Sequence, residues 1–171
     1  MQRYRAGDPR AFDRLYDRYR GPLFRYIKRL AGAEPAEELY QDVWLRLVRA
    51  REQWHADQPF SPWLYRIAHN RVVDHWRAQG IAVDDDKAAD SIPADGPAQE
   101  LLAHLRDCVE RLLALIGMLP PAQRSAFLLK EESGLSLAQI AEVSGCGHET
   151  VKSRLRYAMQ RLRAGLEGCD D

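Results

Sequence analysis

Apolar side chains recur every three or four residues along most of this chain, the spacing that places them on one side of an α-helix. Near the C-terminus, Val151, Leu155, Ala158 and Leu162 stand at i, i+4, i+7 and i+11, which predicts one continuous buried stripe. No segment alternates convincingly between apolar and polar residues at a period of two. The pattern therefore predicts an all-α fold.

The stretch from Leu135 to Arg163 predicts two helices joined by a tight turn. Ser136 is expected to cap the first helix, and Gln139, three residues later, completes a capping box. The sequence Ser-Gly-Cys-Gly at 144–147 supplies the turn, since glycine tolerates the left-handed backbone that ends one helix and redirects the chain. This arrangement is typical of a helix-turn-helix.

The face of the second helix opposite its apolar stripe is polar and basic. Residues 150–163 contain five Lys or Arg and no acidic residue. Such a face is what reading base edges in the major groove of DNA requires. A helical hairpin with a solvated basic face is the alternative. The side chains on this face are Glu149, Lys152, Ser153, Arg156 and Gln160.

The first half of the chain predicts further helices, each with a recognisable start. Asp-Pro, Glu-Pro and Ser-Pro pairs supply a capping side chain or acidic residue, followed by a proline whose missing N–H costs nothing in the first turn. The expected helices run from Asp8 to Gly32 with a kink or brief interruption at Gly21-Pro22, from Glu34 to about Gln53, and from Ser61 to about Gly80.

The second of these helices carries two apolar rows. Beside the row that begins at Leu39 and Val43, a second row contains Tyr40, Trp44 and Val48. One row suffices for a small bundle, so the second predicts a docking surface. The alternative is that Trp44 packs against the third helix. The polar residues at the border of the second row are Glu37, Glu38, Gln41 and Asp42.

The third helix combines aromatic side chains with cations. Trp63, Tyr65 and Trp76 could stack on the bases of a single strand while neighbouring cations meet phosphates. The alternative places these rings in the core, with arginine stems covering them. The polar side chains beside them are Arg66, Asn70, Arg71, His75 and Arg77.

Charge divides the 171-residue chain into three segments, although 25 basic and 25 acidic side chains leave no net charge. Residues 1–79 carry a net +5, residues 80–100 a net −5, and residues 101–171 balance. The middle segment lacks periodicity and is rich in Asp, Ala and Pro, which predicts a disordered or extended tether. We therefore expect two small helical domains, 1–80 and 101–171, joined by an acidic linker at 81–100, with two more helices at 101–117 and 120–134.

Composition argues against several other classes of protein. Three widely separated cysteines, at positions 108, 146 and 169, argue against a disulfide framework. Cys146 and His148 are too few ligands for a zinc site, so no metal or cofactor is expected. No apolar run approaches about 18 residues and no signal peptide is visible, which predicts a cytoplasmic protein without membrane insertion.

With both halves considered together, the sequence resembles the extracytoplasmic-function (ECF) group of bacterial sigma factors, the promoter-specificity subunits of RNA polymerase. The stretch AEELYQDVWLRLVRA resembles the region 2 helix that grips the clamp helices of the largest polymerase subunit. FSPWLYRIAHNRVVDHWR resembles the adjoining strand-opening helix. LPPAQRSAFLLKEESGLSLAQIA and ETVKSRLRYAMQRLR resemble region 4, which reads the upstream promoter element.

The resemblance implies three binding sites and three partners: core RNA polymerase, promoter DNA and an anti-sigma factor. Phe60, Asn70 and Asp74 fall where the family captures a flipped base, and Gly147-His148-Glu149 departs from the usual small, neutral start of the recognition helix. The implied sites are core-polymerase binding at Glu38, Gln41, Asp42 and Trp44; downstream-element DNA at Phe60, Asn70, Arg71, Asp74 and Arg77; and upstream-element DNA at His148, Glu149, Lys152, Ser153 and Arg156.

Two other classes of protein are compatible with a helix-turn-helix, but the sequence lacks features that each requires. A free-standing helix-turn-helix regulator would need a dimer surface or an effector pocket, and no heptad or pocket-like segment is visible. A DNA-cutting enzyme such as a recombinase would need a nucleophile with organised acid, base or metal partners, and the sequence shows no such cluster. We therefore expect a sigma factor that is not an enzyme.

Overall fold

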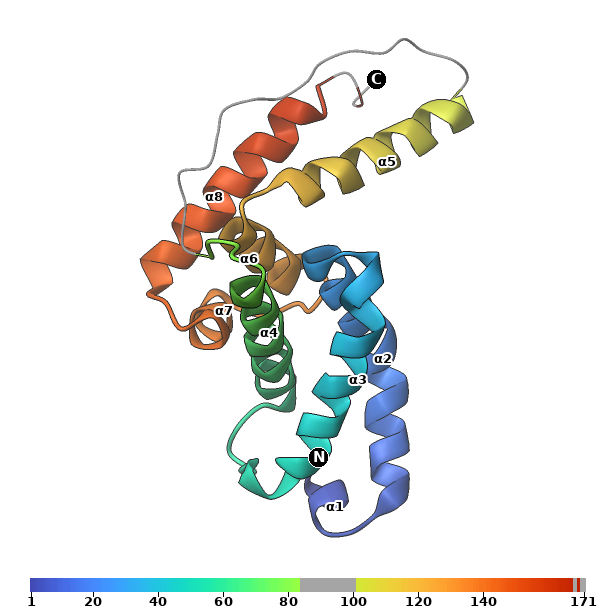
Figure 1. Ribbon diagram of the computed structural model, residues 1–171, viewed down its shortest axis with the longest axis vertical. Coiled ribbons are helices and arrows are strands. Elements are labelled where there is room, and N and C mark those ends of the chain that lie inside the picture. The colour runs from blue at the N-terminus through green and yellow to red at the C-terminus, as the bar shows by residue number, and fades with distance from the viewer. Residues whose placement is uncertain (84–100, 168, 170–171) are drawn as a thin grey trace.

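The computed structural model describes residues 1–83, 101–167 and 169, with only the backbone of 101–106 (Figure 1). Within these residues the regular structure is entirely helical, so the predicted all-α class is confirmed. The helices form a first group, α1–α4, and a second group, α5–α8. Most of the acidic segment for which a tether was predicted lies outside the described residues.

The first group is built on two long antiparallel helices and a third that packs across them (Figure 1). Asp8 caps α2 by accepting from the amide of Arg10 at 3.0 Å. The elements are α1 (Gln2–Arg5), α2 (Pro9–Ala31), α3 (Ala33–Arg49), a 3₁₀ turn η1 (Arg51–Gln53) and α4 (Phe60–Ala78).

Helix α2 continues through Pro22, so the predicted interruption is absent. A proline inside a helix removes one hydrogen bond and costs roughly 3 kcal/mol. Leu23, Tyr26 and Ile27, all fully buried, follow it directly in the sequence and anchor the helix in the core. Burial of three such side chains outweighs the cost, at roughly 1.5–3 kcal/mol each.

The second group contains the helix-turn-helix. The predicted capping box is present: Gln139 N donates to Ser136 Oγ, and Ser136 N donates to Gln139 Oε1. Gly145 ends the first helix of the motif with a φ of 63°, the left-handed conformation that glycine adopts without strain. The elements are α5 (Leu101–Met118), α6 (Pro121–Glu131), α7 (Leu137–Ser144) and α8 (His148–Gly165).

The two groups pack against each other, α7 on α4 and α6 on α2 (Figure 1). At the centre of this interface Tyr26 Oη lies 3.2 Å from Ser125 Oγ, which lies 3.0 Å from His69 Nδ1. At its edge Glu132 accepts hydrogen bonds from both Arg25 and Arg29. Burying these polar groups is acceptable only because each has a partner.

A second set of contacts joins the groups through arginine side chains. Arg124 of α6 reaches the backbone carbonyls of Arg29 and Leu30 at the end of α2, each at 3.5 Å. Arg66 of α4 donates to Glu142 of α7 at 3.3 Å. The interface therefore combines an apolar core with polar contacts that fix how the groups face each other.

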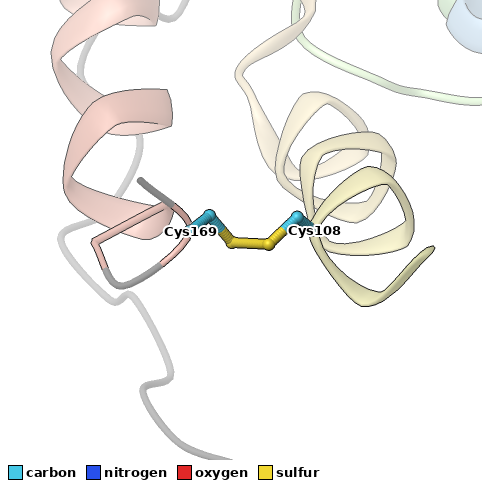
Figure 2. The surroundings of a disulfide bond; sticks show 2 residues. All are labelled: Cys108 and Cys169. Atoms are coloured by element: carbon cyan, nitrogen blue, oxygen red, sulfur yellow. A yellow bond between two sulfur atoms is a disulfide. The ribbon is translucent and has the colours of Figure 1, made fainter. Parts of the chain in front are cut away.

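Cys108 and Cys169 form a disulfide, with their Cα atoms 5.8 Å apart (Figure 2). The sequence argument against disulfide pairing is wrong for these two residues. They stand 61 positions apart, and only the antiparallel packing of α5 on α8 brings them together. Gly165 allows this packing, because a Cβ there would lie 2.5 Å from Leu115 Cδ2.

Candidate polymerase and promoter interfaces

Helix α8 separates a buried face from an exposed one, as the sequence predicts. Val151, Ala158 and Leu162 are buried, whereas Lys152 and Arg156 are exposed. Arg156 lies over the ring of its neighbour Tyr157, 5.0 Å from the centroid. The exposed face therefore presents cations to solvent at the position where a recognition helix meets DNA.

Two residues of α8 differ from the predicted pattern. Leu155, expected in the buried stripe, is only half-buried. Arg154, counted among the basic residues of the helix, is buried with 9% of its surface exposed. Its Nη1 donates to Cys146 Sγ at 3.6 Å. Sequence periodicity could not reveal this, because Arg154 contacts Cys146 in the turn of the motif and lies close enough to His69 of the first group for its charge to lower the pKa of that side chain.

The first turn of α8 forms a small ionic cluster. Lys152 Nζ donates to Glu149 Oε1 at 2.8 Å, and His148 Nδ1 lies 3.8 Å from the same oxygen. Hydrogen bonding and charge from Lys152, with a smaller effect of His148, lower the pKa of the Glu149 carboxyl. Ser153 is half-buried beside them. Glu149 partly neutralises Lys152, which is predicted to bind DNA. The first turn of α8 therefore presents less positive charge to solvent.

Helix α4 presents Asn70, Asp74 and Arg77 on one exposed face. Phe60, at the start of the helix, is half-buried against Tyr19, with ring centroids 5.2 Å apart. Four of the five residues predicted to bind the downstream element are therefore at least partly exposed.

The other aromatic residues of α4 belong to the core. Trp63, Tyr65 and Trp76 are each at most 8% exposed, which supports the packing alternative over base stacking. Arg71, the fifth downstream-element residue, donates to Asp42 of α3. Arg71 is therefore positioned to hold α4 on α3 rather than to extend toward DNA.

The second apolar row of α3 is divided between core and surface. Trp44 is 7% exposed and packs between Phe12 and Tyr16, with ring centroids at 5.8 and 5.0 Å. The structure thus corrects the placement of Trp44 on a docking surface, since its ring completes the bundle. Leu45, which the sequence analysis missed, is 54% exposed. Leu45 lies outside both apolar rows, so periodicity gave no signal for it.

Glu38 and Gln41 are exposed on α3, and Asp42 is half-buried. Burial acts to raise the pKa of Asp42, but hydrogen bonds from Arg71 and Arg46 outweigh it and lower the pKa. The ionised Asp42 therefore ties α3 to α4. Four exposed side chains define what we call the α3 face: Glu38, Gln41, Leu45 and Val48.

The described part of the chain holds no group of three or more His, Cys, Asp or Glu side chains that could bind a metal ion. Across residues 1–83, 101–167 and 169, no helix is both long and apolar enough to cross a membrane.

Two family models match the chain: "Sigma-70 region 2" at residues 15–81 and "Sigma-70, region 4" at residues 109–162. The chain is 32% identical to the RNA polymerase sigma-H factor of Pseudomonas aeruginosa, over 98% of this chain and 92% of that protein. It is 29% identical to the ECF RNA polymerase sigma-E factor of Escherichia coli K12, over 95% and 90%.

Two solved structures share the fold. The sigma factor RpoE of Bartonella quintana, solved with the anti-sigma factor NepR, is 26% identical with a TM-score of 0.71, over 92% of this chain and 97% of that one. CnrH, solved with the cytosolic domain of CnrY, is 23% identical with a TM-score of 0.71, over 99% and 96%.

The helix-turn-helix, the helical first group and both matched regions define a sigma factor, the subunit that directs RNA polymerase to promoters. Within this class, the chain belongs to the ECF sigma factors. Its function is promoter-specific initiation of transcription, and the family is not one of enzymes.

The interface between the two groups should weaken in acid, because His69 is held neutral there. Burial, aided by the charge of Arg154, lowers the pKa of His69 from 6.5 to about 4. The folded chain then binds a proton less readily than the unfolded chain. The contribution of neutral His69 to stability is fully present above pH 6.5. The free energy of unfolding then falls as the pH drops toward 4, by up to about 3 kcal/mol. Urea unfolding across this pH range measures the loss.

A His69→Gln variant provides the control for this prediction. Glutamine can still hydrogen-bond to Ser125 but does not titrate in this range. Its unfolding free energy should lose the pH-dependent step between about 6.5 and 4 that His69 causes. An identical step in the wild type and the variant would contradict the assignment.

Proposed function

We propose that this ECF sigma factor uses three separate helices for three contacts. The α3 face binds core RNA polymerase, α4 engages the opened strand at the downstream element, and α8 reads the upstream element. The observation that carries this proposal is the separation of faces on α8, where Lys152 and Arg156 are exposed while Val151 and Leu162 are buried. Residues 1–80 and 101–171 act as the two functional regions, joined by 81–100.

The α3 face fits the clamp helices of the largest polymerase subunit. It combines an exposed acid, Glu38, with the exposed apolar side chains of Leu45 and Val48. Apolar surface surrounded by polar groups is typical of a protein interface. Asp42 contributes by fixing the neighbouring helix through Arg71 rather than by direct contact.

On α4, base capture is assigned to Phe60, Asn70 and Asp74, with Arg77 near the phosphates. A flipped base is recognised by stacking on a ring and by hydrogen bonds to its edge, which these side chain types supply. The exposed positions of Asn70, Asp74 and Arg77 support this assignment.

On α8, upstream recognition is assigned to His148, Glu149, Lys152, Ser153 and Arg156. The N-terminal part of a recognition helix meets the base edges. Because Lys152 is paired with Glu149 in the free chain, it must exchange this partner to contact DNA. Arg156 has no acidic partner within 4.0 Å among the ion pairs of the described residues and is the main candidate for a base contact.

The chain acts in the cytoplasm, where its polymerase is, and is controlled by an anti-sigma factor. Support for this control comes from the solved relative RpoE, whose structure contains the anti-sigma factor NepR. An inhibitor that binds this chain would need to cover the α3 face or hold the two groups together.

Glu38→Arg should weaken binding to core polymerase by about 2 kcal/mol, roughly 30-fold, because it reverses a charge within the docking face. Glu38 is exposed, so the melting temperature should stay near that of the wild type. The matched control is Glu52→Arg, the same charge change on η1, where the side chain is 81% exposed. Fluorescence anisotropy with purified core enzyme measures both affinities, and equal affinities would contradict the assigned face.

Arg156→Ala should reduce transcription from the cognate promoter, with a loss of about 1–3 kcal/mol if it reads a base. Arg163→Ala, two turns farther from the helix start, removes the same charge and should have a smaller effect. Leu162→Ala should instead destabilise the fold by roughly 2–5 kcal/mol, because Leu162 is buried. In vitro transcription and thermal melting separate the two classes. Unfolding by Arg156→Ala would reverse the face assignment.

The isolated chain should bind promoter duplex poorly and become specific only with core polymerase. It has no net charge to attract phosphate, and one recognition helix supplies contacts to a single half-site. Base capture on α4 adds nothing on closed duplex, since unpairing a base costs a few kcal/mol. Gel-shift titration at physiological salt tests this, and tight specific binding by the chain alone would favour a free-standing regulator.

A further inference from the structure

We propose that Cys108 and Cys169 form a thiol–disulfide switch that fixes α5 at Cys108 to the chain just beyond α8 (Figure 2). This goes beyond promoter recognition and rests on the proposed cytoplasmic location. In that compartment thiols are kept reduced, and the disulfides that do form are mostly transient, catalytic or redox-sensing. A bond that forms here is therefore regulated rather than permanent.

The backbone places the two cysteines within bonding distance. Their Cα atoms are 5.8 Å apart, inside the range that a disulfide requires. Helices α5 and α8 run antiparallel, with Leu115 against Gly165. Moving back along α5 from Leu115 while moving forward from Gly165 brings Cys108 opposite Cys169. The pairing thus follows from the packing of the two helices.

Residues 107–114 of α5 have little else to hold them. No side chain between Asp107 and Ala114 is buried, and the buried face begins at Leu115. Val109 is 56% exposed and Leu113 is 43% exposed. Cys108 lies seven residues before Leu115, about 10 Å along the helix. Segments with few buried apolar contacts open most easily, so the state of the disulfide decides whether residues 107–114 of α5 stay on α8.

The chemistry is thiol–disulfide exchange with a small-molecule disulfide such as oxidised glutathione. One cysteine thiolate attacks a glutathione sulfur, forms a mixed disulfide and releases one glutathione thiolate. The second cysteine thiolate then attacks the protein sulfur of that mixed disulfide and releases the other. Two protein thiols are oxidised, one glutathione disulfide is reduced to two thiols, and the protons move to the glutathione. Both cysteines are half-buried, so the reagent can reach them.

The bond would act on the whole helix-turn-helix. It closes a loop that contains α6, α7 and α8, because it joins α5 to a residue beyond α8. Cross-linking such a loop restricts the unfolded chain and so stabilises the folded one. The bond also fixes the position of α5, the first helix of the second group. On this helix Leu113 lines a cavity of about 360 Å³ together with the basic residues Arg25 and Lys28 of α2.

The test uses the full chain equilibrated in glutathione buffers from reducing to oxidising. Alkylation followed by mass spectrometry should show Cys108 and Cys169 moving together from two thiols to one disulfide. Hydrogen exchange of peptides covering 107–114 should slow several-fold on oxidation, and the melting temperature should rise by about 5 °C or more. Cys108→Ser and Cys169→Ser should each abolish both changes, whereas Cys146→Ser should keep them.

Several results would overturn the switch. Pairing through Cys146 or between two chains would refute the assigned partners. A disulfide that the glutathione buffers cannot reduce would be a permanent cross-link, and one without effect on exchange in 107–114 would not control α5. All measurements are made without polymerase or DNA, so failure here is distinct from failure of the proposed promoter contacts.

Discussion

The arrangement of this sigma factor depends on a buried set of polar groups shared by its two halves. Tyr26 and His69 come from the first group and Ser125 from the second, and their polar atoms lie within 3.3 Å of one another. A buried hydroxyl or imidazole left without a partner costs about 1–3 kcal/mol. Only the packed arrangement satisfies these groups together, so their hydrogen bonds select one orientation among the many that apolar packing would allow.

That orientation determines which surfaces remain outside. Packing α7 on α4 uses the side of α4 that carries Arg66, which donates to Glu142, and leaves Asn70, Asp74 and Arg77 exposed. Packing α6 against α8 uses the apolar stripe of α8 and leaves Arg156 outside. The faces proposed to bind polymerase and DNA are therefore compatible with the packed state. The packed state also sets the spacing and relative orientation of α4 and α8, the two helices proposed to contact the promoter.

The sequence predicted those parts of the structure that depend on neighbours along the chain. The capping of α2 by Asp8, the capping box of α7 and the left-handed glycine at 145 are local, and these are found as expected. The predicted starts at Glu34 and Ser61 are wrong, because both residues lie inside their helices and cap neither α3 nor α4. The side chains whose positions the sequence predicts wrongly make contacts with residues distant in sequence. Trp44 is buried by Phe12, Arg154 is buried near His69 of the other group, and Cys108 meets Cys169 through the packing of two helices. The apolar repeat indicates that one face of a helix is buried, but it does not indicate which residues cover that face. From the sequence, polar residues at an interface between helices are therefore predicted to face solvent or DNA.

Arg124 of α6 also caps the C-terminal end of α2, a helix of the first group. The last carbonyls of a helix carry partial negative charge and need donors, and Arg124 supplies one to Arg29 and Leu30 at the end of α2. Gly32 then turns the chain directly into α3. If the two groups separate, the end of α2 loses this cap and frays more readily. Separation of the second group would thereby also disturb the start of α3, the helix that carries the proposed polymerase-binding face.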